Sequence, residues 1–131
     1  MTLRELGQER YVSLTTFRRV GTEVSTPVWV APENGRLLVW SGVDAWKVRR
    51  IRRDGHVRVA PCSAGGKVRG AALEGQATIL ADTTLVQGLL AGKYGFMYRV
   101  IRLFTALGRA VLRKPEQKSV TIAIVPRRTS S

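Results

Sequence analysis

The chain has 131 residues, with 22 lysines and arginines against nine acidic residues, and a formal net charge of +13 at pH 7. Its length suits one domain, and a content of 44% hydrophobic and 24% charged residues excludes an intrinsically disordered chain. The basic residues are spread along the chain and not gathered in a tail, so we expect a cationic folded surface and an anionic ligand or partner.

The single cysteine, Cys62, excludes an internal disulfide and suits a reducing compartment. The N-terminal segment is too charged to contain the apolar core of a secretion signal, and no run of about 18 apolar residues predicts a membrane-spanning helix. These features predict a cytoplasmic protein with no membrane span.

The first third of the chain predicts three strands. Residues 11–17 are rich in β-branched and aromatic side chains, as is typical of a strand. Residues 23–31 predict a second strand, in which Pro27 marks an edge, a bulge or a ligand-facing backbone because proline has no amide hydrogen to donate. Asn34-Gly35 predicts a tight hairpin into a third strand at residues 37–40.

The central stretch, residues 37–62, predicts a strand, a short basic helix and a further strand at residues 57–61. The helix is expected to begin after Asp44, a candidate N-cap, and to end near Arg53. Six of the twelve residues from position 47 to position 58 are basic, so this helix carries much of the positive charge.

The predicted helix separates apolar from basic side chains. Val48 and Ile51 share one face at i,i+3 spacing, and Lys47 flanks this apolar stripe. Arg49 and Arg53 lie on the opposite side and are expected to serve solubility. A strand ending in a hydroxyl, followed by a helix start and a lysine, can hold a phosphate. The alternative is a solvated basic face on a surface helix.

The remainder of the chain predicts a long strand at residues 67–80, helices at 83–91 and 96–112, an interruption between them at 92–95, and a final strand at 119–125. Six short strands with helices inserted late predict a mainly β fold with peripheral helices. The expected architecture is a six-stranded antiparallel barrel that forms a single domain over residues 1–131.

Conventional catalytic groups are scarce. His56 is the only histidine and stands at a predicted strand start, which favours a surface role over that of a catalytic base. Cys62 is expected to be structural, and the spacing of His, Cys and acidic residues predicts no metal site. Trp29 and Trp40 at strand positions favour core or interface packing over ligand stacking. No catalytic residue is identified, so the activity depends on a cofactor or is absent.

Four blocks of sequence together resemble one family. They are residues 11–21 (YVSLTTFRRVG), 26–29 (TPVW), 47–53 (KVRRIRR) and 57–62 (VRVAPC). The chain resembles the pyridoxamine-phosphate-oxidase-like split β-barrel flavoproteins, in particular the actinobacterial branch of deazaflavin (coenzyme F420)-dependent reductases. The resemblance covers nearly the whole chain and implies an FMN-binding split-barrel type of fold.

The resemblance also implies a homodimer with the cofactor, F420 or alternatively FMN, in a groove between the two barrels. It implies contacts to the cofactor ring and to the cofactor phosphate by two sets of residues: Thr26, Pro27 and Val28 for the ring, and Trp40, Ser41, Lys47 and Arg50 for the phosphate. An acidic Asp44 beside the phosphate weakens anion binding unless it caps the helix.

The expected function is hydride transfer between a deazaflavin and a small unsaturated or quinone-like substrate. F420 carries a phosphate and an oligoglutamate tail, which suits a cationic groove. Two alternatives stay open: a flavin- or deazaflavin-binding protein without turnover, and a basic protein that binds nucleic acid or anionic lipid. Trp46 lies among arginines but in no repeated pattern, so nucleic acid is not expected as a partner.

Overall fold

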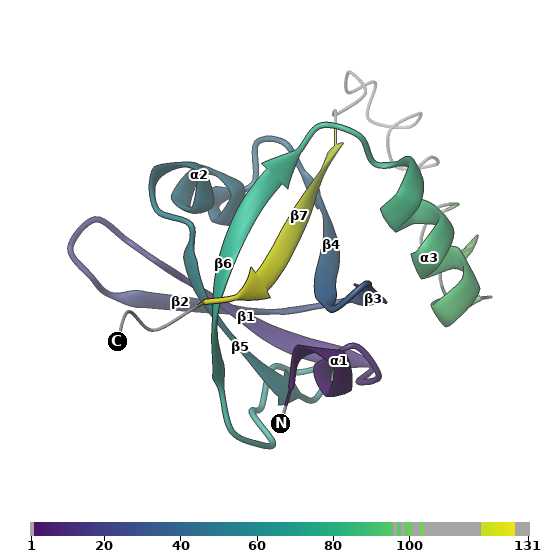
Figure 1. Cartoon of the computed structure of the whole chain (residues 1–131), viewed down its shortest axis with the longest axis horizontal. Coiled ribbons are helices and arrows are strands. Elements are labelled where there is room, and N and C mark those ends of the chain that lie inside the picture. The colour runs from purple at the N-terminus through teal and green to yellow at the C-terminus, as the bar shows by residue number, and fades with distance from the viewer. Residues whose placement is uncertain (1, 96, 98, 101–102, 104–118, 128–131) are drawn as a thin grey trace.

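The computed structural model describes residues 2–95, 97, 99–100, 103 and 119–127, and its main feature is one curled antiparallel sheet (Figure 1). The sheet has the strand order β2-β1-β5-β6-β7-β4-β3. The strands are β1 (Tyr11–Phe17), β2 (Glu23–Val28), β3 (Ala31–Glu33), β4 (Arg36–Gly42), β5 (His56–Cys62), β6 (Leu73–Leu80) and β7 (Ser119–Pro126). The helices are α1 (Leu3–Leu6), α2 (Trp46–Arg53) and α3 (Thr84–Tyr94).

This architecture is a split β-barrel, as predicted, but the sheet has seven strands where six were expected. The expected strand at residues 23–31 is two strands, because the chain changes its pairing partner at Trp29-Val30. β2 pairs with β1 and ends where Val28 lies opposite Val12, whereas β3 pairs with β4. β2 and β3 are therefore the two edges of the open barrel, and Pro27 lies on an edge strand as predicted.

The hairpin between β3 and β4 is confirmed at Asn34-Gly35. Both residues have positive φ, 48° at Asn34 and 81° at Gly35, as the tightest hairpin turns require. The turn brings Glu33 opposite Arg36, and their side chains form an ion pair at 2.9 Å. Local sequence alone therefore determines this corner of the sheet.

The apolar face of α2 fills the interior of the curled sheet. Val48 is 0% exposed and Ile51 is 4% exposed, and both join the cluster that includes Leu14, Val57 and Ile122. The helix packs against β1 and β6. Burial of two such side chains stabilises the fold by about 1.5–3 kcal/mol each, which orients the whole helix.

Three predicted boundaries were wrong. α2 begins at Trp46 with Ala45 in the N-cap position, so Asp44 does not cap it. β6 begins only at Leu73, because the chain turns after Gly66 (φ 92°) and forms no strand over residues 67–72. α3 continues beyond the expected end at residue 91 to Tyr94, so the interruption expected at 92–95 is reduced to its last residue, Gly95, which is the C-cap. Most of the expected helix at residues 96–112 lies outside the described residues.

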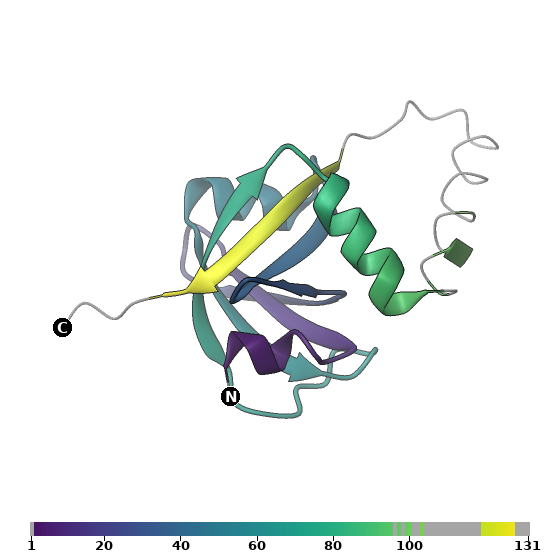
Figure 2. The same cartoon turned by 45° about the vertical axis from the view of Figure 1, so that its right-hand side comes forward.

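α3 packs on the outer face of the sheet, beside β3 and β4 (Figure 2). Its side chains Val86 and Leu90 form a second apolar cluster with Leu38 and Ala123. Leu37 and Val39, on either side of Leu38 in β4, face the barrel interior. This strand is therefore buried on both faces, which explains its continuous run of apolar residues. Among the described residues, no helix combines the length and the apolar content needed to cross a membrane.

The C-terminal end of α3 is held by polar contacts to two other parts of the chain. The Lys93 ammonium donates hydrogen bonds to the carbonyl oxygens of Gly7 (2.7 Å), Glu9 (2.7 Å) and Val30 (2.8 Å). The neighbouring Tyr94 hydroxyl donates to the Arg10 carbonyl at 2.8 Å. Burial lowers the pKa of Lys93 to about 8, and the three carbonyl oxygens stabilise its charged form at neutral pH.

We predict that Lys93→Met lowers the free energy of unfolding by about 2–4 kcal/mol, because methionine fills the space but leaves three carbonyl oxygens without their donor. Urea unfolding followed by circular dichroism measures this. Lys67→Met is the control, since that side chain is exposed. Equal midpoints for both variants would mean that Lys93 does not hold α3 in place.

Candidate functional site

The residues expected to contact a cofactor ring lie at the end of edge strand β2. Thr26, Pro27 and Val28 pair with Leu14, Ser13 and Val12 of β1, and their other side is an edge of the sheet. Pro27 is exposed and Thr26 is partly exposed, whereas the Val28 side chain belongs to the core. Val28 can therefore offer a ligand its backbone but not its side chain.

Trp40 and Ser41 are adjacent on β4, so their side chains lie on opposite faces of the sheet. The Trp40 ring packs against the cluster beneath α3, on the outer face. The Ser41 side chain is buried, and its hydroxyl donates a hydrogen bond to the Gly42 carbonyl at 3.3 Å. Of this pair, Ser41 is the one on the face where α2 packs.

Lys47 is half-buried in the first turn of α2, beside the apolar stripe, as the sequence predicts. Burial lowers the pKa of its ammonium below the ordinary value. Among the described residues, no carboxylate lies within ion-pair distance of Lys47. A desolvated cation without a counter-ion is costly unless an anion joins it, so this position fits an anionic ligand.

Arg50 also projects from α2, but toward β1. Its guanidinium donates to the Thr16 hydroxyl at 3.4 Å. It contributes to a pocket of about 390 Å³ between α2 and the β1–β2 hairpin, which we call the arginine pocket. The arginine pocket is lined by Arg18, Arg19, Trp46, Arg49, Arg50 and Arg53.

Sequence reasoning missed the arginine pocket. The sequence predicts that Arg49 and Arg53 mostly serve to keep the protein soluble. In the structure, the Arg49 guanidinium lies over the Trp46 ring, 5.0 Å from its centroid, and the Arg53 guanidinium donates a hydrogen bond to the Phe17 carbonyl. The adjacent pair Arg18-Arg19 after the first strand was the available signal. Only the packing of α2 on β1 brings that pair beside arginines some thirty positions later in the chain.

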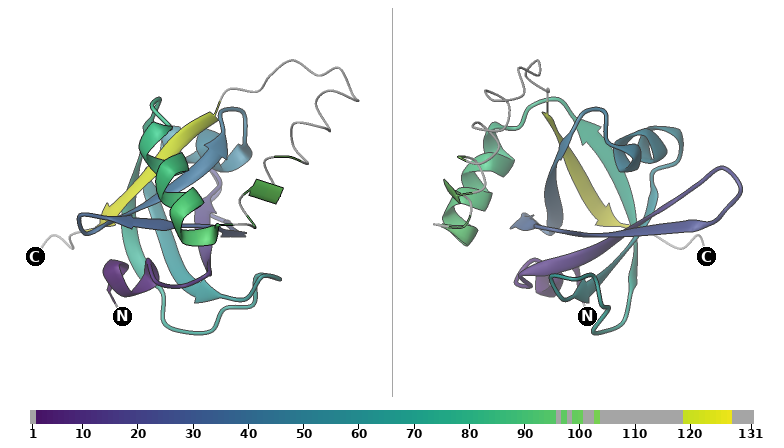
Figure 3. Two further views of the ribbon diagram at one scale, coloured as in Figure 1. Left: turned by 90° about the vertical axis from the view of Figure 1, so that its right-hand side faces the viewer. Right: turned by 180° about the vertical axis from the view of Figure 1, so that it is seen from behind.

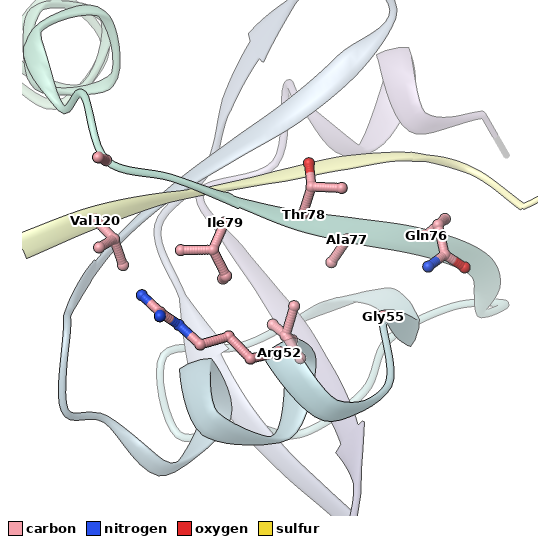
Figure 4. Close-up of a pocket in the computed structure, with 9 residues that line it drawn as sticks. Arg52, Gly55, Gln76, Ala77, Thr78, Ile79 and Val120 are labelled. Atoms are coloured by element: carbon pink, nitrogen blue, oxygen red, sulfur yellow. The ribbon is translucent and has the colours of Figure 1, made fainter.

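A second groove, of about 540 Å³, lies between α2 and β6 (Figure 4). Arg52 extends along it toward Ile79 and Val120. The rest of the lining is apolar or neutral, with Gln76 and Thr78 as its polar side chains. One guanidinium above an apolar floor suits a small ligand with a single negative end, and no sequence motif indicated this groove.

His56 and Cys62 have the structural roles that the sequence favours. His56 stacks on Phe17 at 4.8 Å and contacts the Glu74 carboxylate, which also accepts a hydrogen bond from Arg58 at 2.9 Å. The hydrogen bond from His56 lowers the pKa of the Glu74 carboxyl most, and the hydrogen bond from Arg58 lowers it further. Cys62 is buried, and burial raises the pKa of its thiol, which opposes nucleophilic use.

Within the part of the chain that the structure describes, no group of three or more His, Cys, Asp or Glu side chains could hold a metal ion.

Three solved structures illustrate what this chain is similar to. An F420 reductase shares 18% identity and a TM-score of 0.61, over 98% of this chain and 95% of that one. A protein from Listeria innocua described as a pyridoxamine 5'-phosphate oxidase shares 18% identity and a TM-score of 0.58, over 94% and 88%. An FAD-binding protein from Mesorhizobium loti shares 18% identity and a TM-score of 0.60, over 94% and 83%.

The same fold occurs in HutZ, a haem storage protein from Vibrio cholerae, at 12% identity and a TM-score of 0.65 over 98% of this chain and 93% of that one. No family model and no curated protein matches the sequence. At these identities the likeness establishes only the fold of this chain, a split β-barrel of the type found in flavin- and F420-related proteins. Which ligand this chain binds depends on the residues of its own site.

We predict that Glu74→Gln lowers the free energy of unfolding by less than about 1 kcal/mol near pH 7, because an exposed ion pair is screened by water. The folded-state pKa of Glu74 is lowered, so its contribution is present above the unfolded-state pKa and is lost as the pH falls through the folded value. The difference in stability between the two proteins should therefore shrink as the pH falls and vanish once Glu74 is protonated in the folded state. Thermal unfolding measured across this pH range tests the prediction.

Asp44→Asn is the matched control, since this carboxylate forms no ion pair among the described residues. If the loss of unfolding free energy in Glu74→Gln, relative to the unaltered protein, stayed constant or grew as the pH fell, the proposed stabilisation by the Glu74 carboxylate would be contradicted.

Proposed function

We propose that this protein is an oxidoreductase that transfers a hydride between the deazaflavin cofactor F420 and a small unsaturated or quinone-like substrate. The observation that carries the proposal is Lys47, a half-buried ammonium whose pKa is lowered by burial and which has no carboxylate partner in the described chain. The split-barrel fold shared with an F420 reductase and an FAD-binding protein supports a flavin-type ligand.

The residues present fit the anionic part of such a cofactor. Lys47 supplies the charge, and Ser41 supplies a hydroxyl at the end of β4. The Trp46 and Lys47 amides at the start of α2 are open to an anion, because the Ala45 side chain makes no capping hydrogen bond, whereas the Val48 amide donates to the Ala45 carbonyl at 3.1 Å. Asp44 is exposed and does not cap the helix, so it acts against anion binding. The backbone of Thr26, Pro27 and Val28 would face the ring.

A bound deazaflavin would supply the hydride, and the chain's own side chains would then have the tasks of binding and orientation. The described residues offer no paired acid and base near Lys47, which agrees with that division of work. Trp29 stacks on Tyr94 at 4.2 Å and Trp40 packs beside them, so both rings are engaged beneath α3. Neither ring is then available to block a substrate, which favours turnover over a protein that only stores the cofactor.

We further propose a homodimer, because an open barrel with edge strands β2 and β3 needs a partner to form a closed groove. Exposed Leu80, Leu85 and Val125 leave apolar surface around α3 and β7. We predict a dimer mass at micromolar concentration by light scattering. A monomer mass throughout that range would contradict a groove shared by two copies.

We predict that Lys47→Ala weakens F420 binding by roughly ten- to hundredfold, because a charge-assisted contact to a phosphate contributes about 1.5–3 kcal/mol. Fluorescence titration with F420, and with FMN alongside, measures this and determines which cofactor binds more tightly. Arg4→Ala is the matched control, since it removes the same charge from an exposed position on α1.

Equal losses in the two variants would indicate a diffuse positive field and not a located phosphate site. Unchanged affinity in a folded Lys47→Ala protein would also contradict the site, and tighter binding of FMN than of F420 would replace the proposed cofactor.

A further inference from the structure

The β1–β2 hairpin presents an unusual tip. The hairpin extends away from the barrel (Figures 1 and 3), and its turn is ordered, because the Arg18 amide donates to the Thr22 carbonyl at 2.9 Å and the Gly21 amide donates to the Arg18 carbonyl at 2.8 Å. Val20 at this tip is 82% exposed. A β-branched aliphatic side chain exposed to water at a hairpin tip has no role in the core of this chain.

Helix α2 adds a second exposed apolar group beside the same hairpin. Trp46 is 67% exposed, and it lines the arginine pocket together with Arg18 and Arg19 of the hairpin. We call this surface the arginine face. It combines five residues that line the arginine pocket with Val20, which follows Arg19 at the hairpin tip; the five are Arg18, Arg19, Trp46, Arg49 and Arg53.

Within the described chain, the arginines of this face form no ion pair with a carboxylate. Glu23, the acidic residue nearest to Arg18 and Arg19 in sequence, pairs with Arg58, and Asp54 is the one carboxylate that lines a hollow together with Arg18, Arg19 and Arg53. Several guanidinium groups therefore converge on one surface with a single acidic neighbour, and this excess of positive charge attracts a ligand with several negative charges.

Three kinds of anionic partner differ in what they would use. A small polyanion would use the arginines alone, and a single-stranded nucleic acid would use the arginines and stack on Trp46. Neither would use Val20. A bilayer of anionic phospholipid would use all of these groups, because guanidinium groups bind lipid phosphates while tryptophan and aliphatic side chains enter the headgroup level.

We propose that the arginine face docks this protein on an anionic phospholipid bilayer, with the tip of the β1–β2 hairpin and Trp46 entering the headgroup region. The arginine face includes neither Ser41 nor Lys47, and of the residues expected to contact the cofactor phosphate only Arg50 lines the neighbouring arginine pocket. The proposed docking does not depend on the proposed cofactor. A small apolar substrate that partitions into lipid would be within reach of a protein held there.

The test uses the full chain and vesicles of equal parts phosphatidylcholine and phosphatidylserine, with pure phosphatidylcholine vesicles for comparison. We expect sedimentation with the anionic vesicles only, weakened by added salt. Arg18→Ala/Arg19→Ala should lower the partition coefficient by roughly twenty- to thirtyfold, since each basic residue near the surface contributes about fivefold. Arg4→Ala/Arg69→Ala removes the same charge from exposed positions elsewhere and should cost only a few-fold.

Val20→Ser separates the possible partners, because it leaves every charge in place. We expect it to weaken binding to anionic vesicles and to leave binding to a single-stranded oligonucleotide unchanged. Tryptophan fluorescence should shift to shorter wavelength on binding, and the shift should disappear in Trp46→Leu.

Three results would overturn the proposal. They are equal losses in the two double variants, no effect of Val20→Ser on vesicle binding, and tighter binding of the oligonucleotide than of the anionic vesicles. The third result would identify a nucleic-acid surface instead. F420 titration of the Arg18→Ala/Arg19→Ala protein should be unchanged, which keeps this test independent of the cofactor proposal.

Discussion

Two buried side chains orient all the basic residues of helix α2. Val48 and Ile51 are inserted among the core residues of the curled sheet, and a helix of eight residues held at two positions three residues apart on one face cannot rotate about its axis. That constraint directs Lys47 to the border between core and solvent and Arg49 toward the β1–β2 hairpin. The locations of charge on this protein thus follow from where its apolar residues are buried.

The excess of cations makes counter-ions scarce, and their distribution is informative. Arg58 is bound by both Glu23 and Glu74, so two of nine carboxylates serve one guanidinium on the outer surface of the sheet. Lys47 and the lining of the arginine pocket receive none within the described residues. In a chain of net charge +13, a cluster of cations that forms no internal ion pair marks where an external anion would gain the most favourable interaction.

Sequence reasoning succeeded where structure is locally determined and failed where it depends on distant pairing. Asn34-Gly35 specifies its own turn, and the spacing of Val48 and Ile51 identifies the buried face of α2. The division of residues 23–31 into β2 and β3 was not predictable, because it arises from a change of partner from β1 to β4. The arginine pocket was missed for the same reason, since its two halves meet only through tertiary packing.

The strand order has a consequence for how the chain assembles during synthesis. β7 lies between β6 and β4, although it comes after every other described strand in sequence. Until residues 119–126 have left the ribosome, β3 and β4 form an isolated hairpin and β6 has an open edge. Contacts of such long sequence separation form slowly, and the uncovered apolar edges are open to pairing with other chains in the meantime. Nascent chains of this protein should therefore depend on chaperones until the last strand is made.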